Sequence, residues 1–360
     1  MSNPRQMPSS DRLFEQITGR RSICSEQIVQ TKAIFQKIIL ITGAGGSVGA
    51  ALCRLVLTCE PSRVIMVDRC EAALHRMTKE FEADTRVVSA LADVGDICAM
   101  DALLDGEHVD IVLHGAAHKH VPMAERFPIE YIRNNIFATK ALLEATQRAG
   151  VGQFLLVSTD KAVDPVGVMG ATKRVAELVV LAASTIVQPC SAVRFGNVFG
   201  SSGSVVERFR SDIENGDTLK VTDPQMTRFF MTDSEAAYLI VEAVGLAKGS
   251  EIFSLILGES VLIADVAERL IDVLGGVGER EPQREIEFVG IRAGERLHEP
   301  APAGLPTGQL GILCLNEPPP DSLDLEGLLE SLRCFCEQGR DVDARRALME
   351  LATMHAKKMV

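Results

Sequence analysis

A hydroxyl, a carboxyl and an ammonium group follow one another at Thr159, Asp160 and Lys161, directly after an apolar run that ends at Ser158. A second ammonium group, Lys173, comes in the helical pattern that follows. Ligands of open α/β sheets bind beyond the carboxyl ends of the strands, and a carboxyl beside a lysine can move protons there. We therefore expect this stretch to carry the chemistry of the chain.

A glycine-rich turn lies between the first apolar run of the chain and the helical pattern after it. Gly43 permits a tight turn, Gly46 lets the backbone approach a pyrophosphate, and Gly49 lets the helix pack closely on its strand. Ser47 and Val48 open the helix, whose N-terminus offers free N–H groups and a favourable dipole to phosphates. The order of strand, glycine triplet and helix predicts a dinucleotide-binding turn.

An acid at the end of the second apolar run indicates which dinucleotide binds. Asp68 lies about twenty residues past the triplet, where a carboxylate accepts bonds from the adenosine ribose hydroxyls. It would repel the additional phosphate of NADP, so NAD is favoured, although Arg69 follows and could accept that phosphate. Asp93 and Val94, at the end of the third run, could contact adenine, or they could belong to a helix N-cap instead.

The usual base of short-chain dehydrogenases is missing. These enzymes place a tyrosine one helical turn before a lysine, but neither Tyr131 nor Tyr238 precedes a lysine at that spacing. Met169 stands at that position before Lys173, and a thioether cannot take a proton. Either the chain is inactive, or another group does this work.

Alternating elements must position these residues. Six apolar runs, at 37–42, 63–67, 86–90, 109–113, 153–158 and 191–195, alternate with helical patterns and predict an α/β fold with a doubly wound parallel Rossmann sheet. After 196 the alternation stops, which predicts a smaller α+β substrate lobe. The expected organisation is a loosely attached lead-in at 1–36, an NAD-binding Rossmann domain at 37–195, a substrate-binding lobe at 196–318, with a return to the Rossmann domain left open, and a helical tail at 319–360.

Composition limits the function classes. Hydrophobic content of 46% and charged content of 24% are ordinary for a soluble globular protein, and a net charge of −12 argues against nucleic-acid binding. No apolar run approaches the roughly 20 residues of a membrane span. Nine scattered cysteines indicate reduced thiols and a cytoplasmic protein. The triplet His114, His118 and His120 lacks the spacing of a metal site, so we expect no metal.

Several motifs together resemble the nucleotide-sugar 4,6-dehydratases of bacterial polysaccharide biosynthesis, which are extended short-chain dehydrogenases/reductases. They lie at 43–49, 116–122, 158–162, 168–174, 194–200, 226–231 and 292–295. The chain is similar to the branch that acts on UDP-N-acetylglucosamine and has Met where relatives have Tyr. Many members of that branch carry a transmembrane N-terminal domain, and this chain resembles their soluble catalytic part.

The resemblance implies a reaction and roles at the strand end. Sugar C4 would be oxidised by NAD, Lys161 would remove the acidified C5 proton, Asp160 would protonate the departing C6 hydroxyl, and C6 would then be reduced. Thr159 would bond the C4 hydroxyl and relay its proton. Lys173 would hold the nicotinamide ribose, with Met169 as a positioning group.

Further contacts are implied by the same resemblance. Ala116, Ala117, Lys119 and Ser158 would lie at the cofactor. Asn197, Arg228, Arg292 and Glu295 would hold the nucleotide diphosphate, with Glu295 on the ribose, although each arginine could instead form a structural ion pair. The full set of expected substrate contacts is Lys119, His120, Asn135, Arg194, Asn197, Ser204, Val205, Arg228, Arg292 and Glu295. Asn135 could instead be an ordinary buried residue bonded to a loop.

Two helical patterns, at 130–149 and 168–185, are apolar over more than one face. One face would cover the sheet and another is expected to meet a partner subunit, as in related enzymes. We therefore expect a homodimer or a larger homo-oligomer.

Three functions stay open. A 4,6-dehydratase acting on a nucleotide-diphosphate sugar is the leading one. A UDP-sugar 4-epimerase or 4-keto reductase would not need the pair of Asp160 and Lys161. A non-catalytic NAD-binding partner would explain the missing tyrosine. The chain departs from the family pattern at 164–167, 223–224 and 293, so the sugar and nucleotide are less defined than the reaction.

Overall fold

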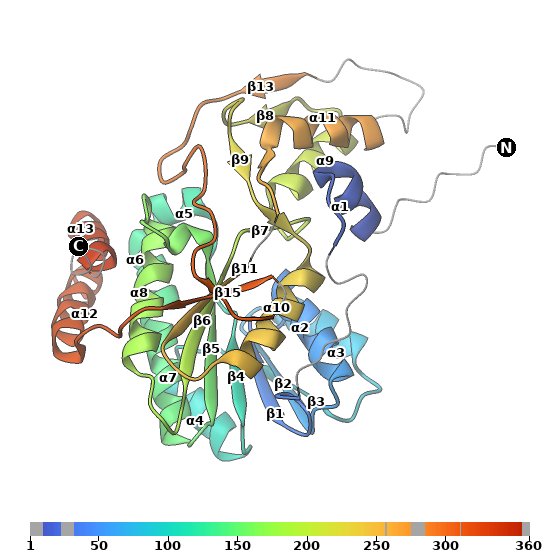
Figure 1. The fold of residues 1–360 in the computed structure, drawn as a ribbon. Helices are drawn as coiled ribbons and strands as arrows, with labels where there is room; N and C mark the ends of the chain where they lie inside the picture. The colour runs from blue at the N-terminus through green and yellow to red at the C-terminus, as the bar shows by residue number, and fades with distance from the viewer. Residues whose placement is uncertain (1–9, 23–31, 256–257, 275–284, 310, 355–360) are drawn as a thin grey trace.

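A nine-stranded sheet in the order β14-β15-β11-β6-β5-β4-β1-β2-β3 runs through the middle of the molecule (Figure 1). The computed structural model describes residues 10–22, 32–255, 258–274, 285–309 and 311–354. Seven neighbouring strands are parallel: β1 (Ile38–Thr42), β2 (Arg63–Asp68), β3 (Val87–Leu91), β4 (Ile111–His114), β5 (Gln153–Thr159), β6 (Cys190–Phe195) and β11 (Glu251–Leu255). The order reverses between β1 and β4, which is where such sheets bind ligands.

Helices cover both faces of the sheet because neighbouring residues of each strand point to opposite sides. Ile39 and Ile41 pack in the core beneath α2 and α10, while Leu40 packs in the core beneath α7 and α8. The first face is covered by α2 (Ser47–Thr58), α3 (Glu71–Glu80) and α10 (Asp233–Leu246), and the second by α4 (Ile97–Asp105), α6 (Pro128–Ile132), a π-helix (Arg133–Phe137), α7 (Ala138–Arg148) and α8 (Val168–Ala182).

The predicted strands are present within two residues of their expected ends, and one expected helix is divided. The pattern at 130–149 begins earlier, at Pro128, and a π-helical turn separates α6 from α7. The chain also returns to the large sheet after the smaller lobe. β11 pairs with β6, and the antiparallel strands β15 (Ile312–Asn316) and β14 (Leu305–Pro306) complete that edge.

The smaller lobe has its own apolar core and lies beyond the strand ends, toward the top of Figure 1. Its elements are α9 (Val205–Asn215), β8 (Leu219–Val221), β9 (Thr227–Arg228), β12 (Val261–Leu262), α11 (Ile263–Leu274) and β13 (Ile286–Phe288). The expectation of a loosely attached lead-in is wrong for its described part. In α1 (Ser10–Thr18), Phe14 and Ile17 are fully buried in this core, and Arg20 pairs with Glu235 at 2.6 Å. Residues 1–9 and 23–31 of the lead-in lie outside the described part of the chain.

The C-terminal segment forms a hairpin of α12 (Ser322–Glu337) and α13 (Asp341–Met354) that packs on α6 and α8 (Figure 1). Leu329, Leu348 and Leu351 join the same core as α8, and α8 is buried from Val168 through Leu181. The face of α8 that we expected to meet a partner subunit is therefore covered by the hairpin of the chain itself. The homodimer or larger homo-oligomer stays a prediction.

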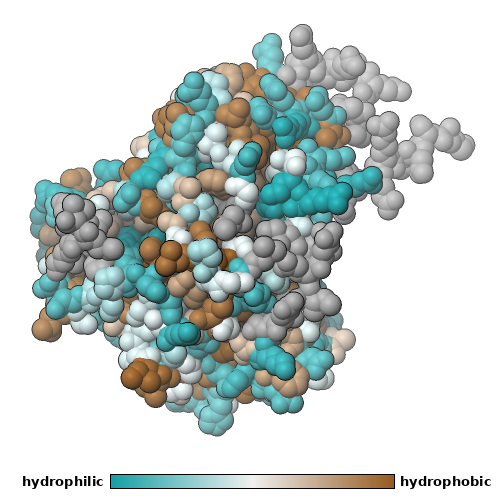
Figure 2. All heavy atoms as spheres, in the orientation of Figure 1, coloured by the Kyte–Doolittle hydropathy of each residue, from teal (hydrophilic) through white to brown (hydrophobic). Residues whose placement is uncertain are grey.

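The surface is mixed in character. On the face shown in Figure 2, apolar side chains are scattered among hydrophilic ones. None of the helices in the described ranges is long and apolar enough to cross a membrane.

Candidate active site

The run Thr159, Asp160 and Lys161 lies where β5 ends and a short 3₁₀ turn (Asp160–Ala162) begins. The Lys161 ammonium donates to Asp160 Oδ1 at 2.9 Å and to Asn197 Oδ1 at 3.0 Å. The Thr159 hydroxyl donates to the same Asp160 oxygen at 2.9 Å. The other oxygen, Oδ2, is buried and has no partner among the described residues. One half of this carboxyl is thus held in place while the other half is left for a ligand.

A second carboxylate, Glu299, reaches the same site and was missed by the sequence reasoning. Its side chain is only 3% exposed, and Oε1 lies 3.6 Å from both Lys161 Nζ and Arg228 Nε. A narrow cavity here is lined by Lys161, Met169, Gly294 and Glu299, among others. The available signal was that Glu299 lies four residues after the motif at 292–295, but nothing in the sequence relates it to Lys161.

Lys173 and Met169 lie on the buried side of α8. Burial lowers the pKa of Lys173 to about 8, while the negative charge of Glu177 acts in the opposite direction. Met169 is 5% exposed and belongs to the apolar core beneath α8. Met169 therefore contributes to the packing of the core. Of Met169 and Lys173, only Lys173 has a side-chain group that can gain or lose a proton.

A second ionic cluster lies directly under the Thr159 run and is completely closed. Glu177 accepts bonds from the Ser158 hydroxyl at 2.6 Å and from Arg194 at 2.8 and 2.6 Å. Arg174 donates to Glu177 at 3.1 Å and also bonds Glu317. Burial alone would raise the pKa of Glu177, but Arg194 and Arg174 outweigh it, so its pKa is lowered.

This cluster changes two predicted roles. Arg194 is buried, and its guanidinium is engaged in a two-bond pair with Glu177, so we do not retain it as a substrate contact. Ser158 is also buried, and its hydroxyl donates to Glu177 instead of to a ligand. Charged groups that are buried away from water need oppositely charged partners, and Arg194 and Glu177 serve as partners for each other.

The glycine turn has the close backbone approach that a dinucleotide requires. Gly43 has a φ of 67°, and a Cβ there would lie 2.9 Å from the Ala116 backbone. A Cβ at Gly49 would lie 2.1 Å from the Gly43 carbonyl oxygen. Asp68 accepts the Gly45 N–H at 2.9 Å, so the carboxylate at the end of β2 fixes this turn. The turn, the helix N-terminus and Asp68 therefore fit a dinucleotide pyrophosphate and ribose.

Four other predicted cofactor residues lie at the start of α2, after β3 and in the loop after β4. Ser47 accepts the Ser202 N–H at 3.1 Å, so α2 contacts the loop before α9. Val48 packs against the core of α2, and Val94 is buried. Ala117 lies next to Ala116, whose N–H donates to Thr42 Oγ1 at 3.2 Å, in the loop after β4.

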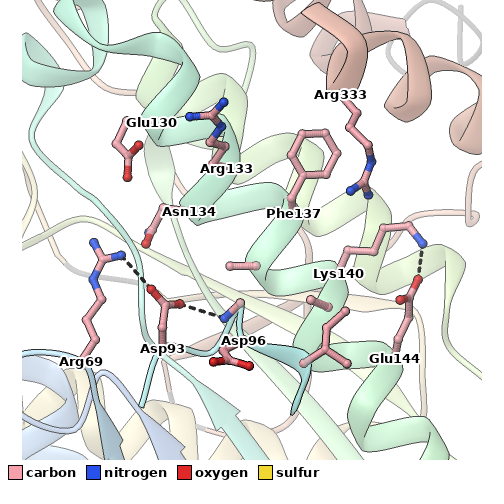
Figure 3. Close-up of a pocket in the computed structure, with 14 residues that line it drawn as sticks. Arg69, Asp93, Asp96, Glu130, Arg133, Asn134, Phe137, Lys140, Glu144 and Arg333 are labelled. Carbon is pink, nitrogen blue, oxygen red and sulfur yellow. Dashed lines mark hydrogen bonds and ion pairs between the residues drawn. The ribbon is translucent and has the colours of Figure 1, made fainter. Parts of the chain in front are cut away.

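Arg69 is engaged by its neighbours. It donates to Asp93 Oδ2 at 3.3 Å (Figure 3). It also donates to His118 Nε2 at 2.8 Å. Burial lowers the pKa of His118, and the charge of Arg69 lowers it further, so the neutral ring can accept this bond. The additional phosphate of NADP would have to compete with Asp93 and His118 for the Arg69 guanidinium, and this favours NAD over NADP.

Asn135 is fully buried on the π-helix and bonds a loop. Its Oδ1 accepts the His118 N–H at 2.8 Å, and its Nδ2 donates to the His118 carbonyl and to Thr172 Oγ1, both at 3.0 Å. Asn135 therefore holds the loop after β4, as in the alternative of a buried residue bonded to a loop. Lys119 on that loop reaches Ser201 at 3.5 Å, and burial lowers its pKa. His120 accepts the Tyr131 hydroxyl at its carbonyl, 2.8 Å away.

On the substrate side, Arg228 is buried and its donors are engaged. It donates to the carbonyls of Thr227, Leu297 and Arg296 at 2.7, 3.1 and 2.8 Å. The predicted diphosphate contact thus anchors the loop at 290–299 in this structure, because two carbonyls of that loop accept its guanidinium donors. Arg292 pairs with Glu295 at 2.7 Å and remains half exposed.

The remaining substrate candidates lie on the first elements of the lobe. Asn197 is in β7 (Asn197–Val198), which pairs with β10 (Phe230–Met231), and it accepts the Lys161 bond. Ser204 caps α9 by accepting the Glu207 N–H at 3.3 Å, and Val205 is the first residue of that helix. Within the described ranges, no group of three or more His, Cys, Asp or Glu side chains could hold a metal ion.

A parallel sheet with a dinucleotide turn after β1 and an acid–base run after β5 defines the class, an extended short-chain dehydrogenase/reductase. The chain belongs to the polysaccharide biosynthesis protein family, whose model matches residues 39–302. A probable polysaccharide biosynthesis protein EpsC of Bacillus subtilis is 41% identical over 290 residues, covering 79% of this chain and 48% of the relative. The chain thus spans about half the length of that relative.

Other relatives carry names from two activities. A UDP-N-acetylglucosamine 4,6-dehydratase (inverting) of Campylobacter jejuni is 35% identical over 270 residues, covering 73% of this chain and 77% of the relative. A UDP-glucose 4-epimerase of Rickettsia canadensis is 31% identical over 274 residues, covering 73% and 76%. The solved structure of Pen from Bacillus thuringiensis matches with a TM-score of 0.69 and 31% identity, covering 73% of this chain and 82% of that one. The family and fold are shown, and the particular reaction needs a separate argument.

Proposed function

We propose that this protein is an NAD-dependent nucleotide-sugar 4,6-dehydratase that acts on UDP-N-acetylglucosamine. The observation that carries the proposal is the adjacent pair of Asp160 and Lys161, with one Asp160 oxygen buried and unpaired. Eliminating water across C5 and C6 needs a base for one proton and an acid for the leaving hydroxyl, and this pair can supply both. An epimerase needs neither.

The cofactor would be held by the turn at Gly43, Gly46 and Gly49, by Asp68 and by Lys173. When bound, NAD supplies oxidation at C4 and reduction at C6, with no net change. Lys161 takes the C5 proton, and the C6–O bond breaks as Asp160 gives its proton to the departing oxygen, so one water leaves. Lys161 acts as the base in its neutral form, and after the reduction at C6 it gives the proton back to C5. The C4 hydroxyl proton recharges Asp160, and the hydrogen bond of 2.9 Å between the two side chains keeps the acid and the base together.

Oxidation of C4 also releases a hydroxyl proton, and Met169 cannot receive it. We assign the contact with the C4 hydroxyl to Thr159, whose own hydroxyl donates to Asp160 at 2.9 Å. The proton can pass along this bond to the carboxylate. Glu299 and Asn197 hold the Lys161 ammonium from the other side, at 3.6 and 3.0 Å.

The competing proposal is a UDP-sugar 4-epimerase, which the match to such an enzyme supports. Mass spectrometry of the product separates the two. Purified protein with NAD and UDP-N-acetylglucosamine should give a nucleotide sugar lighter by one water, with no net reduced cofactor. A product of unchanged mass and inverted C4 would establish the epimerase, and an unchanged sugar with NAD bound would exclude a dehydratase for this substrate.

A further inference from the structure

A crevice of about 510 Å³ lies between the loop after β3, the helices α6 and α7, and the C-terminal helix α12 (Figure 3). Its size is within the range of small-molecule sites. One end is formed by Arg69 and Asp93, and the other by Phe137, Lys140 and Arg333. Two of these end residues, Arg69 and Asp93, are where the sequence places the adenosine half of the cofactor.

The far end of the crevice is built by α12. The Arg333 guanidinium lies 4.6 Å from the centroid of the Phe137 ring, over its face. Arg133 donates to the Cys336 carbonyl of α12 at 3.0 Å. Both contacts join α12 to the π-helix (Arg133–Phe137), so the position of Arg333 is fixed by two attachments and not by one flexible side chain.

Arg333 is less engaged by other side chains than the neighbouring charged residues of the crevice, so its guanidinium is more available to a ligand. Lys140 is paired with Glu144 and Glu326, and Asp96 accepts the Ala99 N–H at 3.0 Å as the cap of α4. Arg333 forms its ion pair with Glu330, which is largely exposed and lies 3.6 Å away. A guanidinium stacked on a ring offers a flat, donor-bearing surface, which suits a flat heteroaromatic base.

The same π-helix also reaches the catalytic side. Asn135, in the middle of this turn, bonds both backbone groups of His118 and the hydroxyl of Thr172, which precedes Lys173. A shift of α12 would therefore be transmitted to the loop after β4 and to α8. The family model ends at residue 302, before the hairpin begins, so this contact lies outside the matched region.

We propose that α12 completes the adenosine end of the cofactor site, with Arg333 on Phe137 forming the wall that faces the adenine base opposite Asp93. The hairpin is then a part of the cofactor site and not only a cover for α6 and α8. The inference rests on the proposed function only in that NAD is the cofactor. It does not depend on which sugar reaction follows.

The test compares Arg333→Ala with Arg346→Ala by isothermal titration of the full chain. Arg346 is an exposed arginine of the same hairpin that pairs with Asp343 and does not line the crevice. Loss of a cation–π contact predicts that Arg333→Ala weakens NAD binding about threefold to thirtyfold. Arg346→Ala should bind NAD like the parent chain, and UDP binding should be unchanged in both.

Two further measurements make the assignment specific. ADP-ribose, which keeps the adenine end and lacks nicotinamide, should lose the same factor with Arg333→Ala. Arg333→Lys keeps the charge without the planar group and should recover only part of the affinity. Unchanged NAD and ADP-ribose affinities in a folded Arg333→Ala protein would overturn the inference. Absence of NAD binding in the parent chain would instead refute the proposed cofactor, and binding without water loss would refute only the dehydratase.

Discussion

Two ionic clusters lie at the end of β5, and neighbouring residues of one strand belong to different ones. The closed cluster begins at Ser158 and consists of Ser158, Glu177, Arg174, Arg194 and Glu317. Both oxygens of Glu177 are bonded, and its side chain is fully buried. These side chains satisfy the hydrogen bonding of one another, so neither oxygen of Glu177 is left for a ligand.

The open cluster begins one residue later and consists of Thr159, Asp160, Lys161, Asn197 and Glu299. It also combines a hydroxyl, two carboxylates and a cation, but a lysine and an amide replace the two arginines, and its partners are incomplete. Asp160 Oδ2 has no partner among the described residues, and Glu299 approaches Lys161 only to 3.6 Å. Incomplete hydrogen bonding, together with a cation that can give up its proton, therefore separates the open cluster from the closed one.

The largest effect should come from the open cluster. Lys161→Met or Asp160→Asn removes the base or the acid, so water elimination should fall about 100- to 10,000-fold, the usual contribution of such groups. The rate of formation of the dehydrated product is measured by mass spectrometry. Unfolding in urea should change much less than the rate. A rate within tenfold of the parent for both variants would remove this pair from the mechanism.

Breaking the closed cluster should damage folding instead. Glu177→Gln leaves Arg194 buried without a carboxylate partner and removes one of the two carboxylates that bind Arg174, which should cost about 3–5 kcal/mol in the free energy of unfolding. Equilibrium urea unfolding measures this. The matched control is Glu80→Gln, which breaks the exposed pair of Arg54 and Glu80 and should cost less than about 1 kcal/mol. Equal losses in the two variants would contradict the assignment of a structural role to Glu177.

Glu299 tests where the open cluster ends. Because the Glu299 carboxylate forms ion pairs with both Lys161 and Arg228 at 3.6 Å, Glu299→Gln should slow elimination about tenfold, which corresponds to about 1.4 kcal/mol of lost electrostatic support. Glu299→Asp should restore part of the rate. ADP-ribose affinity should stay the same, since Glu299 lies on the substrate side. An unchanged rate in Glu299→Gln would reduce this residue to an anchor of the loop at 290–299.

The elements of the cofactor half could be predicted because their signals are local. Gly43, Gly49 and Asp68 lie within one strand–turn–helix–strand unit whose spacing predicts the turn, whereas the close approach of Gly43 to Ala116 results from the pairing of β1 with β4. The Thr159 run was also found at a strand end as expected. The periodicity of apolar residues fixed most of the sheet, since buried parallel strands read as short apolar runs.

The errors concern residues whose partners are distant in sequence. Arg194 and Arg228 look like phosphate ligands by type, but Glu177 and the carbonyls at 296–297 engage them only in the folded chain. The second apolar face of α8 indicated a partner, and nothing in α8 itself shows that α13 covers it. Glu299 was overlooked for the same reason, because only the fold brings it to Lys161.

The smallest effect concerns His114, a buried group with complete hydrogen bonding and no charge. Its ring nitrogens contact Thr42 Oγ1 at 2.7 Å and Thr139 Oγ1 at 2.9 Å. Burial, and then the charge of Lys173, lowers the pKa of His114 from its ordinary 6.5 to about 3. Below pH 6.5 the unfolded chain binds a proton that the native state refuses, so stability falls as the pH falls, until about pH 3.

The size of this effect follows from proton linkage. Between pH 7 and pH 6 the His114 contribution should be about 0.7 kcal/mol of lost stability, and further acidification should approach about 1.4 kcal/mol per pH unit. Urea unfolding at both pH values measures it, with His114→Asn as the control, because all other titrating groups then cancel. The parent chain should lose about 0.7 kcal/mol more than the variant over this interval. Equal losses would mean that the native imidazole accepts the proton, and that the site around Lys173 is open to water instead of closed.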